Sequence, residues 1–153
     1  MSSVTEPDGR GHLVAFMLAL WFGVHSVLSR QVGTCTMGDV DRFVGGALVG
    51  VPAALLAAGL LWRRPAVTPG QLLSLVLPAA LIPVVVLEWT PLALSTTLQG
   101  HHLCGPEHDD LTAGAWSWER LIPAGHLACT AIMAMAALRS WKRGAAASLA
   151  HHE

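Results

Sequence analysis

The sequence predicts an all-α integral membrane protein in which four transmembrane helices form one bundle. Of its residues, 53% are hydrophobic and only 12% are charged, whereas a soluble domain carries about a quarter charged residues. The charges are also clustered, and they separate four uncharged runs of about 20 residues, the length that crosses a bilayer core. Within one membrane domain, 1–153, the expected spans are 12–29, 43–62, 71–90 and 120–139, with a long connection at 91–119.

The first expected span, residues 12–29, follows a short polar segment that contains Arg10. This arrangement also fits the apolar region of a secretory signal peptide. However, no Ala-x-Ala-like cleavage site follows the run, and Glu6 and Asp8 are unusual at the start of a signal peptide. We therefore expect this helix to be retained.

Small residues recur at helical spacing on the second and fourth spans. The second span carries Gly46, Gly50, Ala54 and Ala58, and the fourth carries Ala124, Ala128, Ala131, Ala134 and Ala137. In lipid, close helix packing depends on such residues because burying one Leu against another gains nothing over lipid contact. We expect the two stripes to pack against each other, with contact to a second chain as the alternative.

The segment between the second and third spans, residues 63–70, is rich in turn residues. It contains two prolines and one glycine, which predict a tight turn. The second and third helices are therefore expected to be antiparallel neighbours. Pro78 and Pro83 lie inside the third span, where each removes a helix hydrogen bond and favours a bend.

Charge distribution predicts which side of the membrane each connection occupies. If both termini are cytoplasmic, most cations lie inside, namely Arg10, Arg63, Arg64, Arg139, Lys142 and Arg143. The cations on the outer side are then Arg30, Arg42 and Arg120. Because short cytoplasmic loops retain positive charge, we expect cytoplasmic termini and an extracytoplasmic connection at 91–119.

Tryptophan positions are consistent with this orientation. Trp62 and Trp141 fall at expected inner ends, and Trp89, Trp116 and Trp118 fall at expected outer ends. Indole rings favour the headgroup level of a bilayer, so all five are expected near a membrane boundary.

The orientation also sorts the three cysteines. Cys35 and Cys104 fall in outer connections, where an oxidising compartment permits a disulfide between them, whereas Cys129 lies inside the fourth span. We expect that disulfide to act as a loop staple. No Cys-x-x-Cys motif is present, which disfavours a thiol oxidoreductase.

Three polar residues stand out because ionisable groups inside membrane spans are costly: His25, Glu88 and His126. Counted from Arg30 and Arg120, the two histidines lie at the same depth, roughly 8 to 9 Å below the outer boundary. Two imidazoles at one depth suit axial haem ligation, and a carboxylate added to them suits a transition metal. The same three groups also suit the acid and base of an intramembrane enzyme.

A structural role for the two histidines is the competing interpretation. Each has a hydroxyl one helical turn later, Ser29 after His25 and Thr130 after His126, which provides a local hydrogen-bond partner. The sequence thus allows three interpretations of His25 and His126: a ligand site, an acid/base pair, and a structural hydrogen bond.

The outer connection contains a second group of polar residues. His101, His102 and His108 lie close to Cys104 and to several carboxylates, and borderline metals accept such ligands. The spacing matches no structural zinc pattern, and a metal on Cys104 would exclude the disulfide. A solvated acidic loop is therefore the main expectation, and a metal site the alternative.

These observations predict a small multi-pass cell-membrane protein of accessory or ligand-binding type, with haem or a transition metal as the candidate cofactor. The expected partners are the bilayer, another membrane protein or a second copy, and a hydrophobic small molecule. The alternative is an intramembrane enzyme that uses Glu88, His25 and His126 on a hydrophobic substrate. A net charge of −1 gives no basic surface for nucleic acid.

Overall fold

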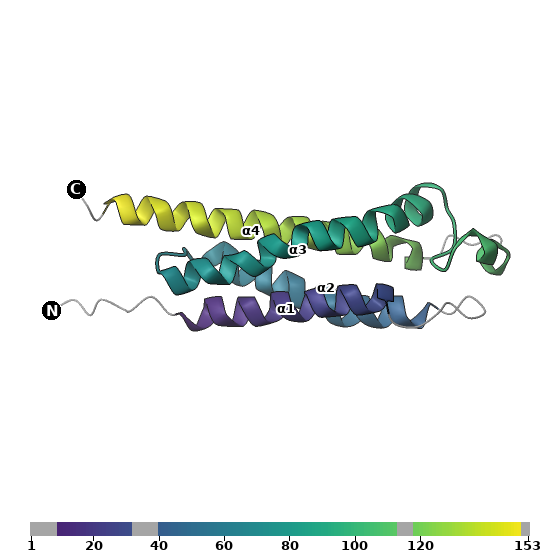
Figure 1. Ribbon diagram of the computed structural model, residues 1–153, viewed down its shortest axis with the longest axis horizontal. Coiled ribbons are helices and arrows are strands. Elements are labelled where there is room, and N and C mark those ends of the chain that lie inside the picture. The colour runs from purple at the N-terminus through teal and green to yellow at the C-terminus, as the bar shows by residue number, and fades with distance from the viewer. Residues whose placement is uncertain (1–8, 32–39, 113–117, 151–153) are drawn as a thin grey trace.

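The structure, a computed structural model, describes residues 9–31, 40–112 and 118–150, and all regular structure in these ranges is helical. Four helices are long and apolar enough to cross a membrane, which confirms the all-helical expectation. They are α1 (Arg10–Gln31), α2 (Asp41–Arg63), α3 (Pro69–Ala93) and α4 (Ile122–Ala150). They form an elongated bundle in which the start of α1 and the end of α4 lie at the same end (Figure 1).

Shorter helical segments close the opposite end of the bundle. The third helix runs past residue 90 and continues into a π-helical turn, η1 (Leu94–Leu98). Two 3₁₀ turns follow, η2 (Pro106–Thr112) and η3 (Trp118–Leu121). The hydroxyls of Thr96 and Thr97 donate to the carbonyl of Arg120 at 3.1 and 2.9 Å, so η1 is tied to η3. We call this end, where η1, η2 and η3 lie, the loop end.

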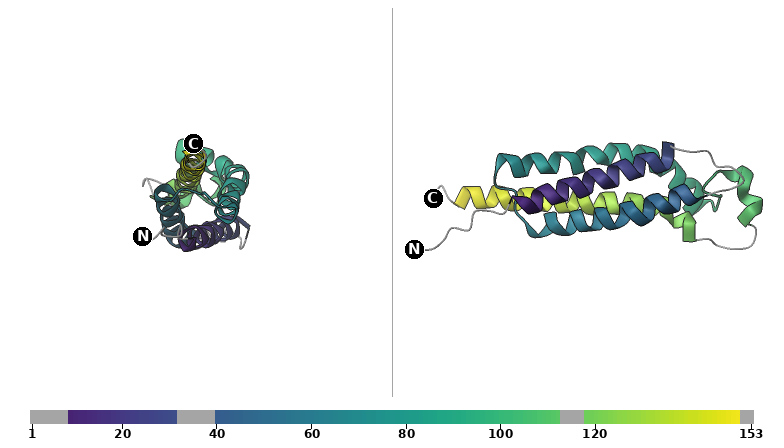
Figure 2. Two further views of the ribbon diagram at one scale, coloured as in Figure 1. Left: turned by 90° about the vertical axis from the view of Figure 1, so that its left-hand side faces the viewer. Right: turned by 90° about the horizontal axis from the view of Figure 1, so that it is seen from below.

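The helices are not arranged in chain order around the bundle. α1 packs against α2 and α3, and α4 packs against the same two helices, so α2 lies diagonally opposite α3 (Figure 2). The expectation that α2 and α3 are neighbours is therefore wrong. Their connection lies against α4: the N–H of Ala66 donates to the Ser140 carbonyl at 3.1 Å, and the Ser140 hydroxyl donates to the Arg64 carbonyl at 2.6 Å. At about 3.3 Å per residue, residues 64–68 are long enough to pass over α4.

Small residues bring α2 close to α1. A Cβ atom added to Gly46 would overlap the Ser29 hydroxyl, and one added to Gly50 would touch Phe22. The α2 stripe thus packs on α1 at these positions, and on α4 Ala128 and Ala131 are exposed. α2 and α4 do pack against each other, but Gly46 and Gly50 of the α2 stripe are used at the α1 contact and not against α4.

Apolar side chains cover the outside of the bundle. All four long helices expose large hydrophobic residues, including Leu13, Met17, Leu48, Leu56, Leu73, Leu87, Met135 and Leu138. The inside of the bundle is narrow and is filled by Ala, Gly and a few large rings. This is the reverse of the polar exterior that a water-exposed helical bundle needs.

Candidate functional site

Four aromatic rings, one from each long helix, meet inside the bundle, and we call them the aromatic layer. They are Phe22 of α1, Phe43 of α2, Trp89 of α3 and His126 of α4, and each is 0% exposed. The His126 ring stacks on Trp89, with centroids 3.9 Å apart and planes 6° apart. Phe22 stacks on His126 at 5.8 Å, and Phe43 meets Trp89 edge-on at 6.2 Å.

Trp89 is thus a core residue and not a boundary anchor. The expectation that its ring anchors the helix in the headgroup region is wrong, because the ring is fully buried between Phe43 and His126. Trp62, Trp118 and Trp141 are exposed, and Trp116 lies outside the described residues. The count along the chain gave no information on the direction of the Trp89 side chain.

The hydrogen bonds of His126 determine which ring nitrogen carries its proton. Nδ1 lies 3.0 Å from the Ile122 carbonyl oxygen. A carbonyl can only accept, so Nδ1 must be the donor, and in a neutral ring Nε2 then presents a lone pair. Nε2 is buried and has no hydrogen-bond partner among the described residues.

Two further buried polar atoms lack a described partner, the indole Nε1 of Trp89 and the hydroxyl of Ser26. A buried polar group without a partner costs roughly 1–3 kcal/mol, so such groups attract a water molecule or a ligand. Within the aromatic layer, Nε2 of His126 can accept a hydrogen bond and Nε1 of Trp89 can donate one.

The local hydroxyl partners contact the main chain and not the imidazoles. Thr130 donates to the His126 carbonyl at 2.8 Å, and Ser29 donates to the His25 carbonyl at 2.7 Å. Both are bonds from a hydroxyl to the carbonyl four residues earlier, which is common for Ser and Thr in helices. Neither bond accounts for the position of an imidazole ring.

His25 is in a different environment from His126. It is half-buried, and its ring contacts Trp21 at a centroid distance of 4.6 Å, where Trp21 itself is 52% exposed. The ring contacts of His126 are instead with Trp89 and Phe22. The described contacts thus do not bring the two imidazoles together.

Glu88 is paired with the end of α1. Its Oε2 lies 4.0 Å from Arg30 Nε, and both carboxylate oxygens lie 3.3 Å from Gln31 Nε2. Arg30 Nε also donates to the Glu88 carbonyl at 3.2 Å. The carboxylate is thus occupied by polar groups at the loop end, although the next residue, Trp89, points into the core.

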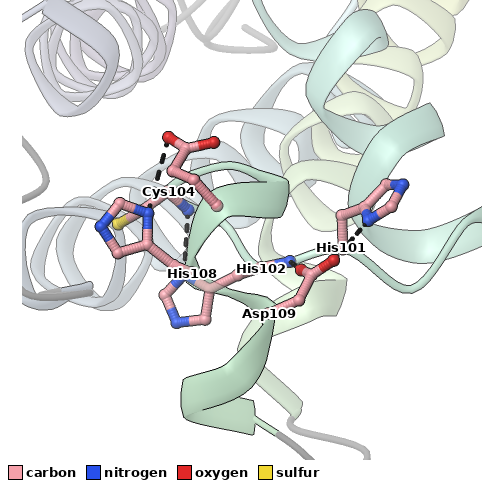
Figure 3. A network of polar contacts seen from close by, with 6 residues as sticks. His101, His102, Cys104, His108 and Asp109 are labelled. Atoms are coloured by element: carbon pink, nitrogen blue, oxygen red, sulfur yellow. Dashed lines mark hydrogen bonds and ion pairs between the residues drawn. The ribbon is translucent and has the colours of Figure 1, made fainter.

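The second candidate site is the loop cluster, which consists of His101, His102, Cys104, His108 and Asp109 (Figure 3), with Glu107, whose Oε1 lies 3.5 Å from His108 Nδ1. Asp109 accepts twice at 2.7 Å, from His101 Nδ1 and from the His102 main-chain N–H. These two bonds, the one from His101 most strongly, hold the pKa of Asp109 below its usual value. The carboxylate thereby fixes the main-chain turn at residues 101 and 102.

His102 has the opposite tautomer to His126. Its Nδ1 accepts the main-chain N–H of Cys104 at 3.1 Å, so in the neutral ring the proton is on Nε2. Burial lowers the pKa of His102 below its usual value, and the nearby His108 adds to this effect. The ring is therefore a structural acceptor in its neutral form.

The geometry gives the metal-site hypothesis no support. Among the described residues, no group of three or more His, Cys, Asp or Glu side chains is placed to hold a metal ion. His101 turns to Asp109, whereas His102 faces His108 with ring centroids 5.8 Å apart (Figure 3). Cys35 lies outside the described residues, so its disulfide with Cys104 stays a prediction, and Cys129 is a buried free thiol.

His12 is a buried polar residue that the sequence pattern did not single out. It is 2% exposed, and its Nε2 and Nδ1 lie 3.2 Å from the Pro65 carbonyl and the Ser74 hydroxyl respectively. It thereby ties α1 to the α2–α3 connection. Because His12 lies close to Arg10 at the start of a span, its position is typical of a solvated helix end. No local sequence signal indicates its partners, which lie more than fifty residues away.

Comparison with protein-family models, with curated proteins and with solved structures gives no match to this chain.

Proposed function

We propose that this chain is a multi-pass cell-membrane protein whose four long helices cross the bilayer. The support is the apolar exterior, where Leu48 is 69% and Leu87 is 75% exposed. Apolar area left in water costs about 25 cal/mol per Å², and a surface of this kind becomes favourable only in lipid.

We further propose that both termini are cytoplasmic. At the end of the bundle where α1 begins and α4 ends, the described charged residues are all cations: Arg10, Arg63, Arg64, Arg139, Lys142 and Arg143. The described carboxylates belong to the loop end: Asp41, Glu88, Glu107, Asp109, Asp110 and Glu119. The positive-inside rule then places the loop end outside.

A pair of reporter fusions tests this topology. Green fluorescent protein fused after Glu153 should fluoresce, and alkaline phosphatase fused at the same place should be inactive, because only the latter needs export. Active phosphatase at Glu153 would overturn the orientation.

Within the membrane, we propose an accessory role in which α3 and α4 bind a transmembrane helix of another protein. The observation that carries this proposal is an apolar groove of about 600 Å³ between the two helices. It is lined by Leu72, Leu75, Val76, Ala79, Ile82, Ala134, Ala137, Leu138 and Trp141. Its alanines allow a third helix to approach closely, which is how helices associate in lipid.

The contacts favour this role over the intramembrane enzyme. Glu88 pairs with Arg30 and Gln31 and has no described bond to an imidazole. An acid/base pair requires its groups within hydrogen-bond reach of one substrate.

Site-specific photocrosslinking in native membranes tests the accessory role. A photoreactive amino acid at Ala79 or Ala134, inside the groove, should give a discrete adduct with a different polypeptide. The matched control is Met17, an exposed residue on α1 that does not line the groove. Adducts of twice the chain's own mass would indicate a second copy instead, and equal adducts from Met17 would contradict a groove-specific partner.

Ligand binding at the aromatic layer is a second candidate function, favoured by the unpartnered Nε2 of His126. A neutral imidazole with its lone pair on Nε2 is the form that ligates haem iron, and a bond from the other nitrogen to a carbonyl orients such ligands. Haem added to the purified protein should give a Soret band that is lost in His126→Ala. An unchanged band in His25→Ala would show that His25 is not the second ligand, and no band at all would remove the haem hypothesis.

We also propose the Cys35–Cys104 disulfide as a staple of the loop end. Under denaturing, non-reducing conditions a maleimide should then label only Cys129, and after reduction it should label all three cysteines. Labelling of all three before reduction would refute the disulfide.

A further inference from the structure

We propose that a basic cleft between the end of α2 and the C-terminal half of α4 binds an anionic phospholipid of the cytoplasmic leaflet. The cleft has a volume of about 490 Å³ and is lined by Trp62, Met135, Leu138, Arg139, Lys142 and Arg143. This inference rests on the proposed membrane topology. The basic cleft is a different site from the α3–α4 groove, and the two share only Leu138 among their lining residues.

The α4 residues of the basic cleft form a single face of the helix. Positions 135, 138, 139, 142 and 143 follow the spacing i, i+3, i+4, i+7 and i+8, which places them on one stripe. Along this stripe the two apolar residues, Met135 and Leu138, come first, and the three cations follow toward the end of the bundle. A phospholipid in the adjoining leaflet has the same order, with acyl chains deeper and the phosphate at the boundary.

Contacts with α2 hold two of the three cations in place. The Arg139 guanidinium lies over the Trp62 ring, 4.5 Å from its centroid. Arg143 Nη1 donates to the Trp62 carbonyl at 3.1 Å, one of the carbonyls that the end of α2 leaves without a helical partner. A stacked guanidinium keeps its N–H edges free to donate to a phosphate, so Arg139 is pre-oriented for an anion.

No described carboxylate lies at this end of the bundle to neutralise the cleft, and Lys142 is exposed. Basic pockets of this kind between membrane helices on the cytoplasmic side suit anionic headgroups. The phosphate chemistry alone would also suit a free phosphate. The apolar half favours the lipid, because Met135 and Leu138 are 55% and 47% exposed and a lipid, unlike a free phosphate, has acyl chains that can cover them.

Native mass spectrometry of the full-length protein in detergent tests the inference with phosphatidylglycerol, phosphatidylcholine and glycerol phosphate as probes. Phosphatidylglycerol should be retained in preference to phosphatidylcholine, and glycerol phosphate should not displace it. The double variant R139Q/K142Q should bind phosphatidylglycerol roughly tenfold more weakly, because each cation near an anionic lipid contributes to affinity. Lys142→Glu alone, at an exposed position, should lose the preference without disturbing the fold.

The matched control is Arg10→Gln, which removes a cation from the same end of the bundle but does not line the basic cleft. It should leave phosphatidylglycerol binding unchanged. Equal retention of both phospholipids, competition by glycerol phosphate, or an equal loss in Arg10→Gln would each overturn the inference. Lipid binding in detergent depends neither on membrane orientation nor on a partner protein. A failure of the lipid-binding experiment can therefore be told apart from a failure of the fusion or crosslinking experiments.

Discussion

Two buried histidines, His126 in the aromatic layer and His102 in the loop cluster, show how these two regions are stabilised. His126 donates from Nδ1 to a carbonyl and is held between the aromatic rings of Trp89 and Phe22. His102 accepts at Nδ1 from a main-chain N–H and is held in a network of hydrogen bonds and charges. The aromatic layer thus depends on packing, whereas the loop cluster depends on the protonation of its members. The substitutions below test that difference.

The largest effect is expected from Trp89→Ala. Removing the indole leaves a cavity between Phe43 and His126, and truncating a buried aromatic residue costs about 3–5 kcal/mol. Thermal unfolding in detergent, followed by circular dichroism, should show a large drop in melting temperature. The control is Trp21→Ala, which removes an indole that is 52% exposed and should change the melting temperature little. Equal drops for both variants would contradict a packing-dependent core.

A smaller effect is expected from Gly46→Ala, because the added methyl group would overlap the Ser29 hydroxyl at the α1–α2 contact. Overpacking costs about 1–3 kcal/mol, so the melting temperature should fall. The neighbouring Gly45 is the matched control, since a Cβ added there meets nothing within 4 Å. Gly45→Ala should be neutral or stabilising, by roughly 0.5–1 kcal/mol. If Gly46→Ala were also stabilising, the close approach of α1 and α2 would be wrong.

A local effect is expected from Asp109→Asn. The variant loses the charge that holds His101 and the His102 N–H. Hydrogen exchange at residues 101–105 should accelerate, while the melting temperature of the helices should stay the same because the aromatic layer is untouched. Asp110→Asn, one residue further along an exposed stretch, is the control and should leave exchange unchanged. A lower helix melting temperature in Asp109→Asn would show that the two regions are coupled.

The smallest effect is expected from pH. Burial lowers the pKa of His102 in the folded cluster below its usual value. Below about pH 6.5 the unfolded loop therefore binds more protons than the folded loop. The stability that neutral His102 provides is therefore complete above about pH 6.5 and is lost as the pH falls toward the folded-state pKa. After correction for intrinsic rates, exchange of the Cys104 amide should become faster from pH 7 to pH 5. His102→Gln should abolish this dependence, and a pH-independent wild type would rule out His102 as its source.

Much of the fold follows from the sequence because lipid-compatible helices need long uncharged runs. The charges of Arg30, Asp41 and Arg63 bound these runs, and the observed helices end close to them. A count along one helix does not give the direction of a side chain, and Trp89 was therefore expected at a membrane boundary and not in the core of the bundle.

The candidate sites were less predictable because their partners lie far apart in the chain. Glu88 is paired by Arg30 and Gln31, more than fifty residues away, and His12 is paired by Pro65 and Ser74 at similar separations. No spacing within a single helix indicates such pairs. The network of His101, His102 and Asp109 lies within one short segment, and the sequence did identify that segment as unusual.

The sequence by itself determined that there are four long apolar helices and where cations and carboxylates fall along them, because these properties depend only on composition and order. The tertiary structure decided which helices are neighbours. It placed α2 opposite α3, since the connection between them packs on Ser140 of α4, and it used Gly46 for the contact with α1. Side-chain volume and hydrogen-bond geometry made those choices, and both become defined only when distant segments meet.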